Sequence, residues 1–403
     1  MRVAAVLWLA AAICYVLLIP PVKVASPADA SAHFSKAEIA RIEGAAPYRN
    51  ASFRYAMART AVTLLLLFGF AFWFGQRIQK LTSTSKLRSF LLFFTIVYWL
   101  LFVVCLPIDY ADGVVLESQW GFLRMGGGEW FWHRLKSSLV SFCGGLVVVT
   151  LVGLFMLHIK RWWLPTAAVS VVFSFVVAFF APLVIAPLFA RFRPLKDEKL
   201  ATRLLSIAKK AHIHTDRVLV CDASSRYTHT NAYFSGIFST RRIVLYDTLL
   251  ENHPSDEVEV VVAHEAGHAR HHHILKGLLL GAIVLFAFWA TVAALVGWLT
   301  KKGVISVQEP RVLAFVALCA IALSLLVAPL ENHLSRRCEA QADLEALRLT
   351  NNPNAFIRAE KRLALHNLSA LNPNGLRYLW FATHPTPLER IGMAEAFKAG
   401  KIH

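Results

Sequence analysis

The chain has 403 residues, of which 57% are hydrophobic and 17% are charged. A soluble globular chain is typically about 45–50% apolar and about 25% charged. Both departures favour a membrane protein. The abundance of Leu, Val, Ile and Phe also excludes a disordered chain, which is poor in such residues.

The net charge of +17 would suit a nucleic-acid-binding protein. The basic residues are scattered, however, and many stand at the ends of apolar runs, where lysine and arginine are common at membrane boundaries. We therefore expect the lipid bilayer as a partner and no nucleic acid. Six cysteines without a CxxC pair indicate neither a disulfide scaffold nor a thiolate metal site.

Seven apolar runs are long enough, or nearly so, to cross a membrane as helices, which takes about 17–25 residues. They cover residues 3–19, 60–76, 89–108, 137–157, 162–190, 277–300 and 312–330. The first run also resembles a signal peptide, because Arg2 precedes it and alanines follow it at 28, 30 and 32. We favour a retained helix, since the run is longer than most signal-peptide cores. The fifth run holds Pro165, Pro182 and Pro187, which predict a kink.

Two long polar segments, 191–273 and 331–403, fall on one side of the membrane when seven spans are counted, so they can form one domain. Short strands are expected at 218–220, 231–238 and 242–246, and an amphipathic helix at 197–212. We divide the chain into an N-terminal membrane domain, 1–190, with five spans, and a second domain, 191–403, which includes the last two spans.

The second domain contains an HExxH motif at residues 264–268. On a helix, His264 and His268 lie on one face and can bind one metal ion, while Glu265 can hold and deprotonate a water molecule. The alternative is an interfacial helix with solvated histidines, which the neighbouring histidines at 271–273 make worth stating.

A catalytic zinc ion needs a third protein ligand, and Glu339 is the best candidate. His268 lies about nine residues before the sixth span and Glu339 about nine after the seventh. If both spans continue as helices, each residue stands roughly 13 Å above the membrane boundary, at 1.5 Å per residue. Asp343, one turn after Glu339, would then accept the second N–H of a ligand histidine. The alternative is a surface salt bridge from Glu339 or Asp343 to Arg336 or Arg337.

Motifs beyond HExxH run in one order from residue 187 to residue 390. They are PLF (187–189), FRPL (192–195), DASSR (222–226), NAYFSG (231–236), RIVLYDTL (242–249), EAQAD (339–343), THP (383–385) and ER (389–390). In these motifs the chain resembles the type I CAAX prenyl proteases, which are seven-span zinc metalloendopeptidases, and their bacterial relatives. The resemblance implies a mainly α, polytopic membrane fold with seven transmembrane helices and a gluzincin-type zinc metalloprotease domain containing a small β-sheet.

The resemblance also implies roles for single residues. His264, His268 and Glu339 would bind one Zn²⁺ per chain, with Glu265 as the general base. Asn231 and Ala232 would lie on an edge strand that aligns the substrate backbone. His384 would stabilise the developing oxyanion, and Arg390 would pair with a carboxylate such as Asp343 or brace its loop. Without the resemblance, Asn231 and His384 are ordinary turn residues.

The implied reaction is hydrolysis of a peptide bond in a peptide or protein substrate, lipidated or not. Many family members carry an aromatic residue directly after the second zinc histidine, where this chain has Ala269. This departure concerns substrate specificity and leaves the chemistry unaffected.

Two other classes compete with this interpretation. An intramembrane metalloprotease of the site-two kind would carry HExxH inside a span, whereas here the motif precedes one. A non-catalytic membrane protein that binds or transports metal would need ionisable residues inside its spans, and these are nearly free of them.

The expected location is a bacterial inner membrane or, in a eukaryote, the endoplasmic reticulum. The distribution of basic residues over the loops predicts that the zinc domain faces outward. The resemblance implies the cytosolic side, and we favour it.

Overall fold

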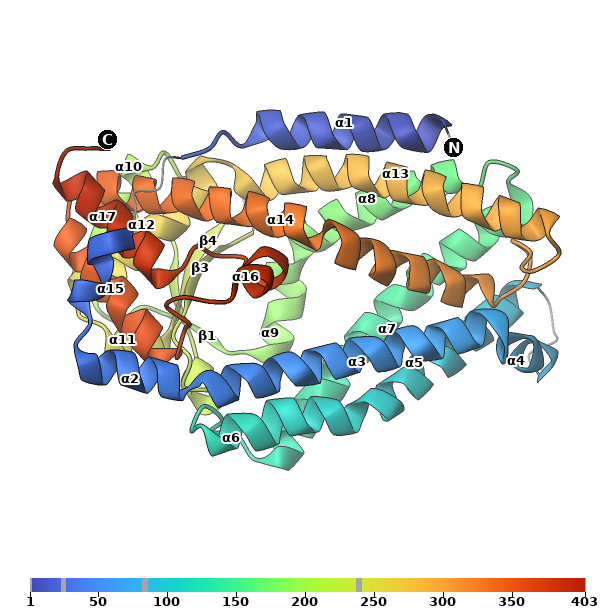
Figure 1. Cartoon of the computed structure of the whole chain (residues 1–403), viewed down its shortest axis with the longest axis horizontal. Coiled ribbons are helices and arrows are strands. Elements are labelled where there is room, and N and C mark those ends of the chain that lie inside the picture. Colours follow the sequence, from blue (N-terminus) through green and yellow to red (C-terminus); the bar gives the residue numbers. More distant parts are fainter. Residues whose placement is uncertain (1, 23–26, 82–85, 237–240, 403) are drawn as a thin grey trace.

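The computed structural model describes residues 2–22, 27–81, 86–236 and 241–402, which form mainly helices (Figure 1). The helices of the first half are α1 (Arg2–Leu18), α2 (Lys36–Gly44), α3 (Ala46–Phe72), α4 (Gly75–Leu81), α5 (Lys86–Tyr110), α6 (Glu117–Gln119), α7 (Gly127–His158), α8 (Trp163–Phe180) and α9 (Ala186–Phe189). Those of the second half are α10 (Glu198–Lys210), α11 (Asp247–Asn252), α12 (Ser255–Arg270), α13 (His273–Lys301), α14 (Val312–Thr350), α15 (Pro353–His366), α16 (Gly375–Phe381) and α17 (Pro387–Lys398). The strands are β1 (Phe192–Pro194), β2 (Val218–Cys221), β3 (Ala232–Ser235) and β4 (Arg242–Tyr246).

Six helical segments among the described residues are long and apolar enough to cross a membrane. They are Lys36–Phe72, Lys86–Gln119, Gly127–His158, Trp163–Phe189, His273–Lys301 and Val312–Thr350. The run expected as the first span forms α1, whose apolar stretch Arg2–Tyr15 is shorter than these six. Helix α1 lies along α13, where the Trp8 indole N–H donates to Thr291 Oγ1 at 3.2 Å (Figure 1). A seventh crossing stays a prediction.

The fifth expected span is irregular, as its prolines predicted. Helix α8 passes into a π-helical turn, Ala181–Ile185, and then into the short helix α9. Pro182 stands at the start of that turn, where its missing N–H and its ring disturb the α-helical hydrogen bonds.

A four-stranded sheet in the order β1-β2-β4-β3 lies at one end of the molecule, among α10, α11 and α12 (Figure 1). Strands β2 and β4 are parallel, and the two outer strands are antiparallel to their neighbours. The strands expected at 218–220 and 242–246 are confirmed, and the strand expected at 231–238 forms as β3, with residues 237–238 outside the described residues. Strand β1 was not predicted, because three residues are too short for a pattern. Strand β3 is therefore an edge strand of this sheet.

One condition of the height argument for Glu339 does not hold. The argument assumed that the HExxH helix continues into the sixth span, but α12 ends at Arg270 and α13 begins at His273. Between them His272 adopts a left-handed conformation with φ of 53°. Helix α14, by contrast, runs without interruption from the apolar region to Thr350. The break redirects the chain so that His273 turns back toward α12.

Candidate metal centre

The HExxH motif lies on the last two turns of α12, a helix that is buried on most sides. The acidic residues Asp256 and Glu257 stand in its first turn, where their negative charges interact favourably with the positive end of the helix dipole. Buried valines and alanines then pack this helix into the core beside the sheet. His264 and His268, one turn apart, direct their rings to the same point, and their Nε2 atoms lie 3.1 Å from each other.

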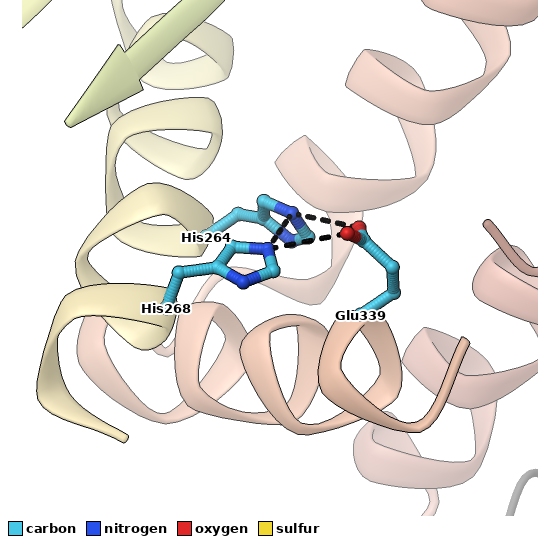
Figure 2. Close-up of side chains that lie close together, drawn as sticks. All are labelled: His264, His268 and Glu339. Atoms are coloured by element: carbon cyan, nitrogen blue, oxygen red, sulfur yellow. Dashed lines mark hydrogen bonds and ion pairs between the residues drawn. The ribbon is translucent and has the colours of Figure 1, made fainter. Parts of the chain in front are cut away.

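Glu339 reaches the same point from α14 (Figure 2). One carboxylate oxygen lies 3.2 Å from His264 Nε2, and the other lies 3.4 Å from His268 Nε2. Four ligands at about 2.0–2.1 Å from a tetrahedral zinc ion are separated from one another by about 3.3 Å. The three side chains therefore form a triangle whose sides, 3.1, 3.2 and 3.4 Å, are close to that separation, with a different Glu339 oxygen facing each histidine.

Gly267 allows α12 and α14 to approach closely enough to form this triangle. A Cβ atom added to Gly267 would lie 2.8 Å from the Ala342 Cα and 2.9 Å from the Ala342 carbonyl oxygen. Both are backbone atoms of α14, so they have little freedom to move aside. The absence of a side chain at this HExxH position therefore sets the spacing of the two helices.

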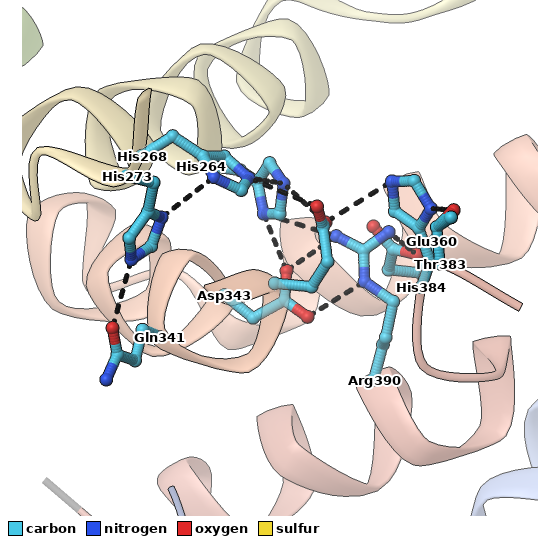
Figure 3. Close-up of polar contacts among 10 residues, drawn as sticks. His264, His268, His273, Gln341, Asp343, Glu360, Thr383, His384 and Arg390 are labelled. Atoms are coloured by element: carbon cyan, nitrogen blue, oxygen red, sulfur yellow. Dashed lines mark hydrogen bonds and ion pairs between the residues drawn. The ribbon is translucent and has the colours of Figure 1, made fainter. Parts of the chain in front are cut away.

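Asp343 fixes the orientation of the His264 ring (Figure 3). Its Oδ1 lies 2.7 Å from His264 Nδ1, and Arg390 binds the same carboxylate through Nε at 2.8 Å and Nη2 at 2.5 Å. Burial alone would lower the pKa of His264, but the carboxylates of Asp343 and Glu339 raise it to about 10. The carboxylates of Asp343 and Glu339 therefore strongly favour a positive charge at the point where His264, His268 and Glu339 meet.

His268 has a partner that the sequence interpretation overlooked. Its Nδ1 lies 2.9 Å from His273 Nδ1, and His273 Nε2 lies 3.0 Å from the Gln341 amide oxygen (Figure 3). Gln341 in turn donates from Nε2 to the Pro20 carbonyl oxygen at 2.9 Å. His273 and Gln341 are both buried. The histidines at 271–273 had suggested a solvated surface, and only the position of His273 five residues after His268 carried a signal.

The residues present fit a divalent metal ion. Both Nδ1 atoms are engaged, so in the neutral form that a metal ligand requires, His264 and His268 would direct the lone pairs of Nε2 at the point that Glu339 also faces. His264, His268 and Glu339 offer one ligand atom each, all within 4.8 Å of one another. Such a gathering of acceptor atoms is stable only around a positive charge.

Glu265 and His384 lie near the three residues, and both line one cavity. Burial raises the pKa of the Glu265 carboxyl, which favours its acceptance of a proton. His384, on the loop before α17, lies with Nε2 3.4 Å from the Glu339 carboxylate, and its side chain is 60% exposed. Arg336 holds this loop by donating to the carbonyl oxygens of Tyr378 and Ala382 at 3.1 and 2.6 Å. Arg336 is therefore engaged with backbone and does not form the surface salt bridge considered as an alternative.

Two cavities meet at Glu265. The first, the α13-side cavity, has a volume of about 1290 Å³ and includes Phe234, His268, Ala269 and Ile274 in its lining. The second, the α16-side cavity, has a volume of about 950 Å³ and includes Asn231, His264, His384 and Arg377. Strand β3 runs from the second cavity to the first. Asn231, at its start, is exposed, and its Oδ1 accepts a hydrogen bond from the Ala232 N–H at 2.9 Å.

The fold and the cluster together define a polytopic membrane protein with a candidate metal site beside the edge strand of a sheet. Two family models match the chain: "Peptidase family M48" over residues 194–398, and "CAAX prenyl protease N-terminal, five membrane helices" over residues 23–191. The chain belongs to peptidase family M48.

Individual relatives agree with this assignment. The chain is 30% identical to an uncharacterized metalloprotease, YhfN, of Bacillus subtilis, over 73% of this chain and 70% of the relative. It is 30% identical to CAAX prenyl protease 1 of Saccharomyces cerevisiae, over 72% and 68% of the two chains. The crystal structure of S. mikatae Ste24p superimposes with a TM-score of 0.77 at 25% identity, covering 88% of each chain. The protein is thus a multi-pass membrane metalloprotease that resembles CAAX prenyl protease 1.

Proposed function

We propose that this protein is a zinc metalloendopeptidase in which His264, His268 and Glu339 bind one Zn²⁺. The observation that carries the proposal is the gathering of these three side chains, whose facing nitrogen and oxygen atoms lie 3.1–3.4 Å apart, close to the separation of ligands around a tetrahedral ion. Asp343 and Arg390 hold His264 in the tautomer that leaves Nε2 free for the metal.

Bound zinc supplies a Lewis acid that polarises the scissile carbonyl and lowers the pKa of a water molecule toward about 7. Glu265 accepts the proton of the attacking water and passes it to the leaving amine nitrogen. His384, which faces the same point from the loop before α17, donates a hydrogen bond to the carbonyl oxygen as negative charge develops on it. This route requires no serine or cysteine nucleophile.

The substrate backbone would add to the open edge of β3, with Asn231 and Ala232 as its first contacts. The substrate is a peptide or protein. The names of the relatives suggest either C-terminal processing of prenylated proteins or a related bacterial role in membrane proteolysis.

We further propose the seven-span, gluzincin-type architecture, with α1 as the first crossing and a division into domains at residues 190 and 191. In keeping with the resemblance, the domain that holds the metal centre faces the cytosol, from a bacterial inner membrane or from the membrane of the endoplasmic reticulum. A reporter that is active only in the cytosol, fused after residue 403, would be inactive if this orientation is wrong.

The central test compares Glu265→Gln with the wild type. Because acid–base catalysis typically contributes about 10²–10⁴-fold, Glu265→Gln should retain zinc and lose at least about 100-fold in cleavage of a quenched peptide. Glu251→Gln, an exposed position on α11, is the matched control and should behave as the wild type. Full cleavage by Glu265→Gln would overturn the mechanism. Zinc binding without any cleavage by the wild type would favour a non-catalytic metal-binding or transport protein.

A further inference from the structure

The α16-side cavity contains two guanidinium groups, those of Arg49 and Arg377, that no step of the mechanism uses. Arg49 comes from the first turn of α3 and Arg377 from α16, so segments far apart in the sequence bring them to one cavity. The same cavity extends to Asn231, Glu265 and His384 at the metal centre.

Both guanidiniums are held by neutral acceptors. Arg49 donates through Nη1 to the carbonyl oxygens of Ile42 and Leu368, each at 2.8 Å. Arg377 donates to the Asn50 Oδ1 at 2.7 Å and to the Arg49 carbonyl oxygen at 2.5 Å. Within the described residues, neither group forms an ion pair with a carboxylate. A guanidinium has five N–H donors, so each retains donors for a further acceptor.

The third arginine of this cavity is different. Arg390 is neutralised by Asp343 and by Glu360, whose Oε2 lies 2.7 Å from Arg390 Nη1. The uncompensated positive charge of the cavity therefore lies at Arg49 and Arg377. Their surroundings, Asn50, Ser52, Asn367 and Asn374, add amides and a hydroxyl, all of which can bind an anion.

The direction of β3 shows which end of a substrate would reach this cavity. β3 begins at the α16-side cavity, near Asn231, and continues to the α13-side cavity, near Phe234. Antiparallel pairing is the more stable per residue, and a peptide that adds antiparallel to β3 enters the α16-side cavity with its carboxyl end. The strand direction and the arginine charges are independent observations, and both suit a C-terminal carboxylate.

We propose that Arg377 and Arg49 bind the C-terminal α-carboxylate of the substrate, beyond the scissile bond. The inference rests on the proposed peptidase function and deepens it, because it makes the free carboxylate a determinant of specificity. Guanidinium groups bind carboxylates by paired, charge-assisted hydrogen bonds. A merely structural role, in which the two arginines brace α3 against α16, would be indifferent to the charge at the peptide terminus.

The test uses the full-length zinc-loaded protein and one short peptide that it cleaves within a few residues of the C-terminus. The peptide is made in two forms, with a free carboxylate and with a C-terminal amide. We expect kcat/KM to be at least about tenfold higher for the acid, the range of a hydrogen bond to a charged group. Arg377→Gln should bring this ratio close to one, and Arg377→Lys should retain part of it.

A second variant keeps the guanidinium in place. Asn50→Asp puts a carboxylate against Arg377 and should lower the acid-to-amide ratio without removing any arginine contact. Arg203→Gln, which loses only an exposed pair with Glu259, is the matched control and should keep the wild-type ratio.

The outcomes separate the inference from the function on which it rests. Equal cleavage of acid and amide by the wild type, or a wild-type ratio in both Arg377→Gln and Asn50→Asp, would overturn the carboxylate site. In either case, cleavage that depends on Glu265 would leave the peptidase function standing. Cleavage that continues unchanged when Glu265 is replaced would instead count against the proposed function.

Discussion

Replacement of His273 by phenylalanine should weaken zinc binding, although this residue is not one of the proposed ligands. His273 Nδ1 accepts the N–H of His268 at 2.9 Å and fixes which ring nitrogen of His268 faces the metal. His273→Phe keeps an aromatic ring of similar size but leaves the His268 N–H and the Gln341 oxygen without their partner. Loss of such an outer partner typically costs about 10–100-fold in metal affinity.

That loss corresponds to about 1.4–2.8 kcal/mol, at 1.4 kcal/mol for each tenfold change. Two lost hydrogen bonds at about 0.5–1.5 kcal/mol each account for a change of this size. Zinc affinity would be measured by competition with a chromophoric chelator, and thermal unfolding without metal would report the effect on the fold alone.

His273→Asn provides the conservative comparison, because its amide oxygen can still accept from His268 and should restore part of the affinity. His271→Phe changes a neighbouring histidine that pairs with Glu345 rather than with His268. Wild-type zinc affinity in His273→Phe, or an equal loss in His271→Phe, would refute the reasoning.

Two further predictions concern helix spacing and pH. Gly267→Ala should destabilise the fold by about 1–3 kcal/mol and weaken zinc binding, because the added Cβ would lie 2.8 Å from the Ala342 backbone. Gly277→Ala, which has open space around it, is the control and should do neither. Equal melting temperatures for the two variants would contradict this prediction. The second prediction rests on His229, whose two ring nitrogens face oxygens of Glu117 and Asn367 at 3.2 and 3.3 Å. The hydrogen bond to Glu117 raises the pKa of His229 against the opposing effect of burial. A pKa raised on folding gives stability that is complete below the unfolded value of about 6.5 and is lost as pH rises through the folded value. His229→Gln should therefore lower the melting temperature more at pH 5.5 than at pH 8.5, and an equal effect at both would count against the pair.

The sequence predicted the elements whose signals are local. Long apolar runs identified the six helical segments that are long enough to cross a membrane, and short runs of strand-forming residues identified β2, β3 and β4. The spacing of HExxH was enough to direct His264 and His268 at one point, because four residues make nearly one helical turn. The argument that His268 and Glu339 stand at equal heights above the membrane boundary selected a residue that does lie beside the two histidines, even though one of the two helices is interrupted.

The sequence could not predict contacts that depend on the packing of distant segments. The chain of hydrogen bonds from His268 through His273 and Gln341 to Pro20 joins residues more than 300 positions apart. Arg49 and Arg377 share a cavity only because the start of α3 packs near α16. Nothing in the local pattern around either arginine distinguishes it from the other basic residues of a chain with net charge +17.

The interruption between α12 and α13 places His273 beside His268. A continuous helix would carry residue 273 farther along the axis of α12, about 7.5 Å beyond His268 at 1.5 Å per residue. The left-handed His272 instead turns the chain so that His273 Nδ1 comes within 2.9 Å of the His268 ring. A left-handed residue other than glycine typically costs on the order of 1–2 kcal/mol. The hydrogen bonds that His273 forms with His268 and Gln341 offset a cost of that size, so the break and the positioning of His268 stabilise each other.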